Sequence, residues 1–265
     1  MVARQISALD SEVSSFLSSS LAAGLLEDKL VIVGGDHGNR FSWSRTSLGG
    51  RFEERMPFMS VSLPHRVATQ FPAWQRNLHN NRDKLLSHFD IHVTMSRYLS
   101  QSADNTSRVT SRSPLSLLET SAGHNRTCSE AGVPEYYCVC IPETYLPTRS
   151  PLIYKATKNL LRKINSLVRG YSDLCRRQQL KTIHEARRLE NRARRLRLVV
   201  STTTGAVYEA LLSSDGAEVE GDINRLDWGG SSMDCVQADY LQLFCHCKPQ
   251  VQHTDSLQQD LFSNT

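Results

Sequence analysis

At residues 30–38 the chain reads Leu-Val-Ile-Val-Gly-Gly-Asp-His-Gly, a short β-branched run followed by two glycines, an acid and an imidazole. An unbroken apolar run of this length is typical of a strand that is buried on both faces. In open α/β sheets, ligand-binding groups follow the carboxyl ends of such strands. Asp36 and His37 are therefore candidate metal ligands, because a carboxylate with an imidazole suits zinc or manganese. The alternative is an Asp turn followed by an exposed histidine.

Several blocks after this stretch follow in a definite order. They are an arginine at position 40, Gly-Arg-Phe-Glu-Glu-Arg-Met-Pro-Phe at 50–58, and Phe-Asp-Ile-His-Val-Thr at 89–94. Together with the Asp-His-Gly of 36–38 and a Cys-rich tail, this order resembles the late half of the alkaline-phosphatase superfamily. It is most similar to the sulfatase-like family catalogued as domain of unknown function 229. The resemblance covers nearly the whole chain, from about residue 10 to about residue 248.

The resemblance implies an α/β fold, namely a partial alkaline-phosphatase-like domain with helices on a mostly parallel sheet, followed by a small Cys-rich α+β region. A chain of 265 residues is long enough for one large domain or two small ones. We expect four parts: the C-terminal half of the α/β domain at 1–100, a surface or linker segment at 101–127, a Cys-rich helical and β region at 128–248, and a flexible tail at 249–265.

Enzymes of the resembled superfamily hydrolyse phosphate or sulfate esters with bound metal. The resemblance implies that Asp36 and His37 hold a divalent metal, which would be zinc, manganese or calcium in the complete family fold, and that the partner is a phosphate or sulfate ester. Arg40 can match the oxygens of such an ester, and His92 is a second candidate for a substrate or supporting role. The alternatives are an arginine paired with Glu53 or Glu54, and a histidine that is exposed or caps a helix.

The nucleophile and the first metal carboxylates come early in such folds, whereas only 35 residues precede Asp36. We therefore assign no catalytic residue, and we expect a fragment of the hydrolase fold that holds no metal tightly by itself and is inactive as given. Catalytic metal sites usually need three protein ligands. The alternative is a non-catalytic secreted binding protein that keeps a remnant of the sulfatase-like fold.

Cysteine usage points to an oxidising compartment. Two sets share the spacing C-x9-C-x-C, and a seventh cysteine, Cys175, is left over. The candidates for disulfides are Cys128, Cys138, Cys140, Cys235, Cys245 and Cys247. Disulfides are favoured over zinc, because zinc sites usually space their ligands C-x2-C.

Two sequons, at Asn105 and Asn125, fit the same extracellular or secretory location. The first residues, however, contain no signal peptide, and no run reaches the roughly 18 apolar residues of a membrane helix. These two observations conflict, and the sequence alone leaves the conflict open.

The positive charge is concentrated in residues 176–197, which carry nine Lys and Arg against two Glu, or +7 in a chain of net charge +4. Apolar residues recur there every three to four positions, so the pattern predicts an amphipathic helix. We do not expect nucleic acid as a partner, because no aromatic residue is interleaved with the arginines. Helices are also predicted at 10–26, 91–99 and 151–170, and a small antiparallel sheet at 196–203, 206–212 and 219–226.

Overall fold

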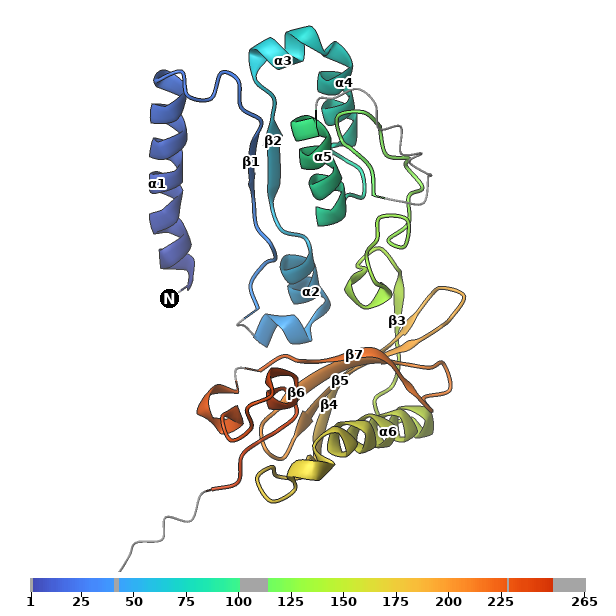
Figure 1. The fold of residues 1–265 in the computed structure, drawn as a ribbon. Coiled ribbons are helices and arrows are strands. Elements are labelled where there is room, and N and C mark those ends of the chain that lie inside the picture. Colours follow the sequence, from blue (N-terminus) through green and yellow to red (C-terminus); the bar gives the residue numbers. More distant parts are fainter. Residues whose placement is uncertain (1, 41–42, 101–113, 228, 250–265) are drawn as a thin grey trace, which may run out of the picture. The chain divides into compact units, whose positions relative to one another are not determined.

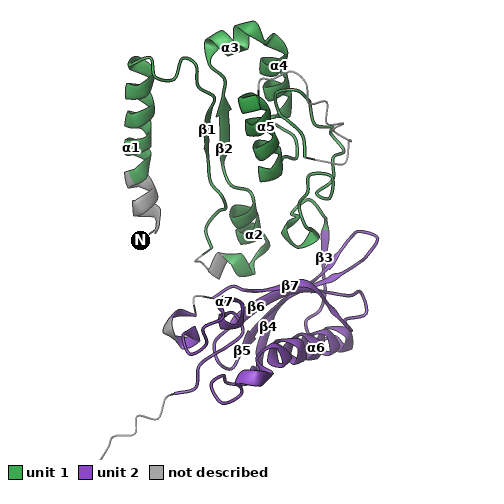
Figure 2. Ribbon diagram, viewed as in Figure 1, with its two compact units in different colours: residues 1–142 green, residues 143–265 purple. Residues whose placement is uncertain are grey.

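The structure is a computed structural model that describes residues 2–40, 43–100, 114–227 and 229–249. The chain divides into two compact units, residues 1–142 and residues 143–265 (Figure 2). The described part is α+β, with a two-stranded sheet and a five-stranded sheet, and every pairing is antiparallel. The expected mostly parallel α/β sheet is therefore wrong, although a Cys-rich C-terminal region is present.

The first unit is mainly helical around one short ribbon (Figure 1). Its helices are α1 (Val2–Ala22), α2 (Leu48–Arg55), α3 (His65–Gln70), α4 (Pro72–Asn81) and α5 (His88–Ser100). Its strands are β1 (Val31–Gly34) and β2 (Met59–Ser62), and short 3₁₀ turns cover Trp43–Thr46 and Glu135–Tyr137.

The direction of β2 explains why the parallel sheet was mispredicted. Val31 pairs with Ser62 and Gly34 pairs with Met59, so β2 returns alongside β1. The connection between them contains α2, and Gly35 extends the ribbon by donating its amide to the Phe58 carbonyl at 3.0 Å. A parallel pair would need a crossover over the face of the sheet. Here the connecting helix instead lies near the end of the ribbon, because the Gly38 amide donates to Glu54 at 2.8 Å.

One face of the ribbon packs on the core of the first unit. Ile91 of α5 and Leu115, Leu117 and Ala122 from the following segment form a buried cluster. Side chains of β1 and β2 pack against this cluster: Ile32, Met59 and Val61. Residues Val31, Ile32 and Val33 are all half-buried, so the strand is not buried on both faces as its apolar run had suggested.

The second unit is a five-stranded antiparallel sheet with one long helix (Figure 1). Its strands follow in the order β3 (Glu143–Tyr145), β4 (Leu180–Leu189), β5 (Leu196–Thr202), β6 (Val207–Leu212) and β7 (Val219–Arg225). The helices are α6 (Pro151–Leu167) and α7 (Asp239–Gln242), with 3₁₀ turns at Arg169–Tyr171 and Gly230–Met233. The predicted β-sheet at 196–226 is confirmed.

Helix α6 forms because its start and its apolar face are both encoded locally. The Ser150 hydroxyl accepts a hydrogen bond from the Ile153 amide, and Pro151 occupies the first turn, where no amide hydrogen is needed. Ile153, Leu160 and Ile164 recur at helical spacing and are fully buried against the sheet. Burial of each such side chain stabilises the fold by roughly 1.5–3 kcal/mol.

The predicted helix at 176–197 is wrong, because most of this segment forms β4 and the turn into β5. Its register shifts between Leu180 and Thr182 and again between Ile183 and Glu185. Each bulge inserts an extra residue, so side chains three positions apart reach the same face. Leu180 and Ile183 thus both pack on the core with Ala186. The bulged strand therefore imitates the periodicity of a helix.

Three disulfides join the described cysteines: Cys128–Cys138, Cys175–Cys245 and Cys235–Cys247. Cys140 is the free cysteine and is exposed. The assignment of Cys175 as the residue left over is therefore corrected, since its backbone forms a bridge with Cys247 and its sulfur bonds to Cys245. None of the helices in the described part of the chain combines the length and apolar character that crossing a bilayer requires.

Candidate functional site

The loop that follows β1 is held against the C-terminal end of α2. The Gly38 amide donates to the Glu54 carbonyl, and a Cβ atom at Gly38 would overlap the backbone of Glu53. Helix α2 itself begins at a cap, because the Ser47 hydroxyl accepts from the Gly50 amide at 3.2 Å. The segment between β1 and β2 thus contains a helix that contacts the loop carrying Asp36 and His37.

Asp36 and His37 lie just beyond the end of β1, with their side chains together. Asp36 Oδ1 accepts the His37 backbone amide at 2.9 Å. His37 Nδ1 lies 2.7 Å from the Gly38 carbonyl oxygen, which can only accept, so Nδ1 carries the hydrogen. His37 Nε2 lies 3.4 Å from Asp36 Oδ2. The Asp36 side chain is 87% exposed and that of His37 31%.

This arrangement suits a cation between the two side chains. In a neutral ring with its hydrogen on Nδ1, Nε2 presents a lone pair to a carboxylate oxygen, so a cation bound between them would favour this contact. A ligating histidine usually donates its other N–H to a carbonyl or a carboxylate, as His37 does to Gly38. Two ligands of a tetrahedral zinc with bonds of about 2.0–2.1 Å are roughly 3.3–3.5 Å apart. The 3.4 Å separation fits that geometry.

The described residues complete no such site around this pair. No third His, Cys, Asp or Glu among them places a ligand atom within 4.8 Å of both Asp36 and His37. His88, which the sequence analysis did not select, contacts the backbone beside this pair, because its Nε2 lies 3.0 Å from the Gly35 carbonyl oxygen. In the sequence, the one indication of this contact was the position of His88 directly before the Phe-Asp-Ile-His block. Asp36 and His37 are thus two potential ligands rather than a full set.

Arg40 lies on the same loop and faces Glu54. Its Nε is 3.6 Å from Glu54 Oε1, and Arg45 donates to the same oxygen at 2.8 Å. The Arg40 side chain is half-exposed, whereas those of Arg45 and Glu54 are nearly buried. The other carboxylate oxygen, Oε2, is buried and accepts no hydrogen bond within the described residues. The Arg40 guanidinium is therefore partly open to solvent while it faces Glu54.

Among the described residues, the contacts of His92 do not include Asp36 or His37. It is on the exposed side of α5, and its carbonyl oxygen accepts the Ser96 hydroxyl at 2.9 Å. Within the described part of the chain, no hydrogen bond or ion pair joins His92 to Asp36 or His37. The structure does not bring His92 into the candidate site through any direct contact.

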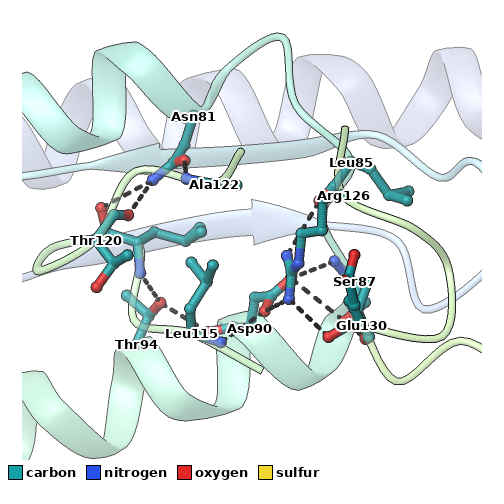
Figure 3. A network of polar contacts seen from close by, with 12 residues as sticks. Asn81, Leu85, Ser87, Asp90, Thr94, Leu115, Thr120, Ala122, Arg126 and Glu130 are labelled. Carbon is teal, nitrogen blue, oxygen red and sulfur yellow. Dashed lines mark hydrogen bonds and ion pairs between the residues drawn. The ribbon is translucent and has the colours of Figure 1, made fainter. Parts of the chain in front are cut away.

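The other polar residues of the 89–94 block are structural (Figure 3). Asp90 is fully buried, and its two oxygens accept two hydrogen bonds at 2.8 Å from the guanidinium fork of Arg126. Asp90 also accepts the amides of Ser87 and Leu115, each at 2.8 Å. Helix α5 begins at His88, three residues before the start of the predicted helix at 91–99, so Asp90 lies in its first turn.

A second set of contacts fixes the same segment further along (Figure 3). The Thr94 hydroxyl accepts the Leu117 amide at 2.9 Å and donates to the Asp90 carbonyl. Asn81 of α4 donates to the Thr120 carbonyl and accepts the Ala122 amide. Buried polar groups need such partners, because an unpaired one costs about 1–3 kcal/mol. This network joins α4 and α5 to residues 115–122 and supports the ribbon that carries Asp36.

The candidate glycosylation sites differ in how they can be described. Asn125 is exposed in a turn, while its neighbour Arg126 reaches inward to Asp90. Thr127, the third residue of this sequon, is exposed, and its hydroxyl donates to Glu130 at 3.0 Å. Asn105 lies outside the described residues. Asn125 is thus placed where a glycan could extend into solvent.

The fold and the loop define an α+β, disulfide-bonded chain with a carboxylate–imidazole pair beyond a strand. The family model described as "Protein of unknown function (DUF229)" matches residues 2–184, and the chain belongs to this family. Searches of curated proteins and of solved structures give no match. The resemblance to domain of unknown function 229 is therefore confirmed.

Proposed function

We propose that Asp36 and His37 supply part of the metal site of a phosphate- or sulfate-ester hydrolase-like protein. The observation that carries this proposal is the 3.4 Å separation of His37 Nε2 and Asp36 Oδ2, with Nδ1 already committed to the Gly38 carbonyl. Zinc and manganese are the ions that this donor pair suits best, and calcium is the further candidate of the family fold.

In this proposal, the residues of the chain bind the metal ion, orient its ligands and attract the anionic ester. Asp36 and His37 would hold the ion at an exposed edge, with Asp36 oriented by the His37 amide and His37 by the Gly38 carbonyl. A divalent metal bound there would polarise an ester oxygen and lower the pKa of a bound water. The Arg40 guanidinium would leave Glu54 to match the oxygens of the ester.

We also propose that this chain alone does not turn over substrate. Two protein ligands are one fewer than a catalytic zinc usually has, and the described residues offer no third beside this pair. We expect weak binding of the metal and no hydrolysis.

A metal titration tests the site separately from activity. Purified chain is titrated calorimetrically with zinc and with manganese, alongside Asp36→Ala, His37→Ala and the control His65→Ala, an exposed histidine at the start of α3. We expect the first two variants to lose tenfold or more in affinity and the control to match the parent. Equal affinity in all four chains would refute the metal site.

The same samples are then assayed with aryl phosphate and aryl sulfate. We expect no turnover in either metal. Turnover that Asp36→Ala abolishes would contradict the inactivity of the chain while supporting the site.

The second candidate is a non-catalytic extracellular binding protein. Three disulfides in the described residues are compatible with that location, and the incomplete ligand set agrees with lost catalysis. Glycosylation at Asn125 would accompany it. Attachment of a glycan at Asn125, when the chain is directed into the secretory pathway of an insect or mammalian cell line, would support this candidate. Absence of metal binding by the parent chain in the titration would favour it over the first candidate.

A further inference from the structure

Three cysteines of the first unit bring their sulfurs together. Cys128 and Cys138 form a disulfide, and Cys140 follows two residues later with a free, exposed thiol. The sulfur atoms of all three lie within 4.8 Å of one another. A thiol therefore lies next to a disulfide with which it could exchange.

The second cysteine set shows that the same spacing closes in a different way. Both sets read C-x9-C-x-C, but Cys235 bonds to the third cysteine of its set, Cys247, whereas Cys128 bonds to the second. Within each disulfide the two Cα atoms are similarly spaced, at 5.9 Å in Cys128–Cys138 and 5.8 Å in Cys235–Cys247. Cys235 also keeps its sulfur 3.5 Å from the middle cysteine, Cys245. The spacing is thus compatible with closure of the first cysteine onto either of the other two.

We propose that Cys128, Cys138 and Cys140 form a thiol–disulfide exchange site in which Cys128 pairs alternately with Cys138 and with Cys140. Cys140 loses its proton to solvent, and its thiolate attacks the Cys128 sulfur. The Cys128–Cys140 bond forms as the Cys128–Cys138 bond breaks, and the Cys138 thiolate takes up a proton. One disulfide and one thiol are present before and after, so no oxidant or reductant is consumed.

The exchange has a direct structural consequence. The closed loop lengthens from a sequence separation of 10 to one of 12, which is the separation of Cys235–Cys247. Its new end, Cys140, lies two residues before Pro142, the last residue of the first unit. The thiol also moves from the exposed Cys140 to the buried Cys138. The exchange therefore moves the covalent tether toward the start of β3 and hides the reactive thiol.

Mass spectrometry under native conditions tests the proposal. Oxidised chain is held at pH 8 without denaturant, quenched with acid, unfolded, labelled with N-ethylmaleimide at low pH and mapped by peptide. We expect two populations, one labelled at Cys140 with Cys128–Cys138 intact, and one labelled at Cys138 with Cys128–Cys140. The pairings of Cys175–Cys245 and Cys235–Cys247 should remain single in the same sample, which excludes general scrambling. Label that stays on Cys140 alone would overturn the proposal.

Two variants test each pairing by itself. Cys140→Ser should leave Cys128–Cys138 as the one disulfide of the set and give no label at Cys138. Cys138→Ser should form Cys128–Cys140 on air oxidation, with the circular dichroism of the parent. If Cys138→Ser retains that circular dichroism but keeps both Cys128 and Cys140 as free thiols, the alternate pairing does not form and the proposal fails. Loss of the Cys138→Ser fold leaves the native labelling experiment as the deciding measurement.

Discussion

Gly38 is placed where the loop after β1 meets the backbone of α2. The atoms that an added Cβ would meet belong to Glu53 and Glu54 main chain rather than to a movable side chain. The neighbouring residues Asp36 and His37 keep their orientation through contacts with this same loop, at His37 N and Gly38 O. A single glycine therefore sets the distance between the candidate ligands and α2.

We predict that Gly38→Ala destabilises the first unit by about 1–3 kcal/mol, since a methyl group has to displace packed backbone. Gly49→Ala is the matched control, because nothing lies within 4 Å of a Cβ at that position of α2. Alanine there should be neutral or stabilising by up to about 1 kcal/mol. Urea unfolding followed by circular dichroism measures both. Equal stabilities of the two variants would show that the close approach at Gly38 is relaxed in solution.

At the scale of elements, α5 owes its position to ion pairing as well as to apolar packing. Asp90 in its first turn is fully buried, and Arg126 is 4% exposed in its side chain. Arg126 also donates to the Leu85 carbonyl, at the turn before α5. The pair thus joins the beginning of the helix to a segment 36 residues later in the chain.

Removing the charge of Asp90 should therefore loosen several elements at once. We predict that Asp90→Asn costs about 3–5 kcal/mol, because it leaves a buried guanidinium without its counter-charge. Asp83→Asn is the control, because the Asp83 side chain is 68% exposed beside Lys84 and its removal should leave the stability close to that of the parent. Hydrogen exchange of the α5 amides reports the effect locally. Protection in Asp90→Asn as strong as in Asp83→Asn would contradict this role.

The second unit combines a buried ionic network with its apolar core. Arg197 of β5 is 1% exposed and binds Glu143 of β3 at 2.7 Å and Glu209 of β6 at 2.8 Å. Burial opposes the charge of Arg197, but the Glu209 and Glu143 carboxylates outweigh it and raise the pKa of Arg197. A permanently charged side chain on β5 thereby links the neighbouring strand β6 and, across β4, the edge strand β3.

At the scale of the whole molecule, the disulfides differ in the length of chain that they close. Cys175–Cys245 spans 70 residues of the second unit and Cys235–Cys247 spans 12. Restriction of the unfolded chain predicts contributions of about 4 and about 3 kcal/mol, respectively. The longer link closes a loop that contains β4 to β7, whereas the shorter one closes only the C-terminal turns.

We predict that Cys175→Ala/Cys245→Ala lowers the stability of the second unit by more than Cys235→Ala/Cys247→Ala does. Paired substitutions prevent the nearby Cys235 and Cys245 sulfurs from joining in a new disulfide. Exchange of the β5 and β6 amides at increasing urea measures the unfolding of this unit alone. A larger loss in the short-loop variant would mean that packing around the sulfurs, rather than loop length, decides the contribution.

Much of the local structure could be predicted from the sequence. The apolar face and the cap of α6 lie within 18 residues, and β5 and β6 follow one another across a short turn, so neighbours in the chain decide these elements. The membership of the family could also be read from short blocks such as residues 36–38 and 89–94. The adjacency of Asp36 and His37 made them a candidate pair before any coordinates.

Tertiary structure decided what depends on distant residues. The return of β2 alongside β1, the bulges of β4, the pairing of Cys175 with Cys245 and the bond between Asp90 and Arg126 all join positions that no local pattern relates. The spacing of apolar residues shows which face of a segment is apolar, but a bulged strand and a helix can have the same spacing. Whether such a segment becomes a helix or a strand is determined by the distant residues that pair with it, and only the tertiary fold brings these residues close.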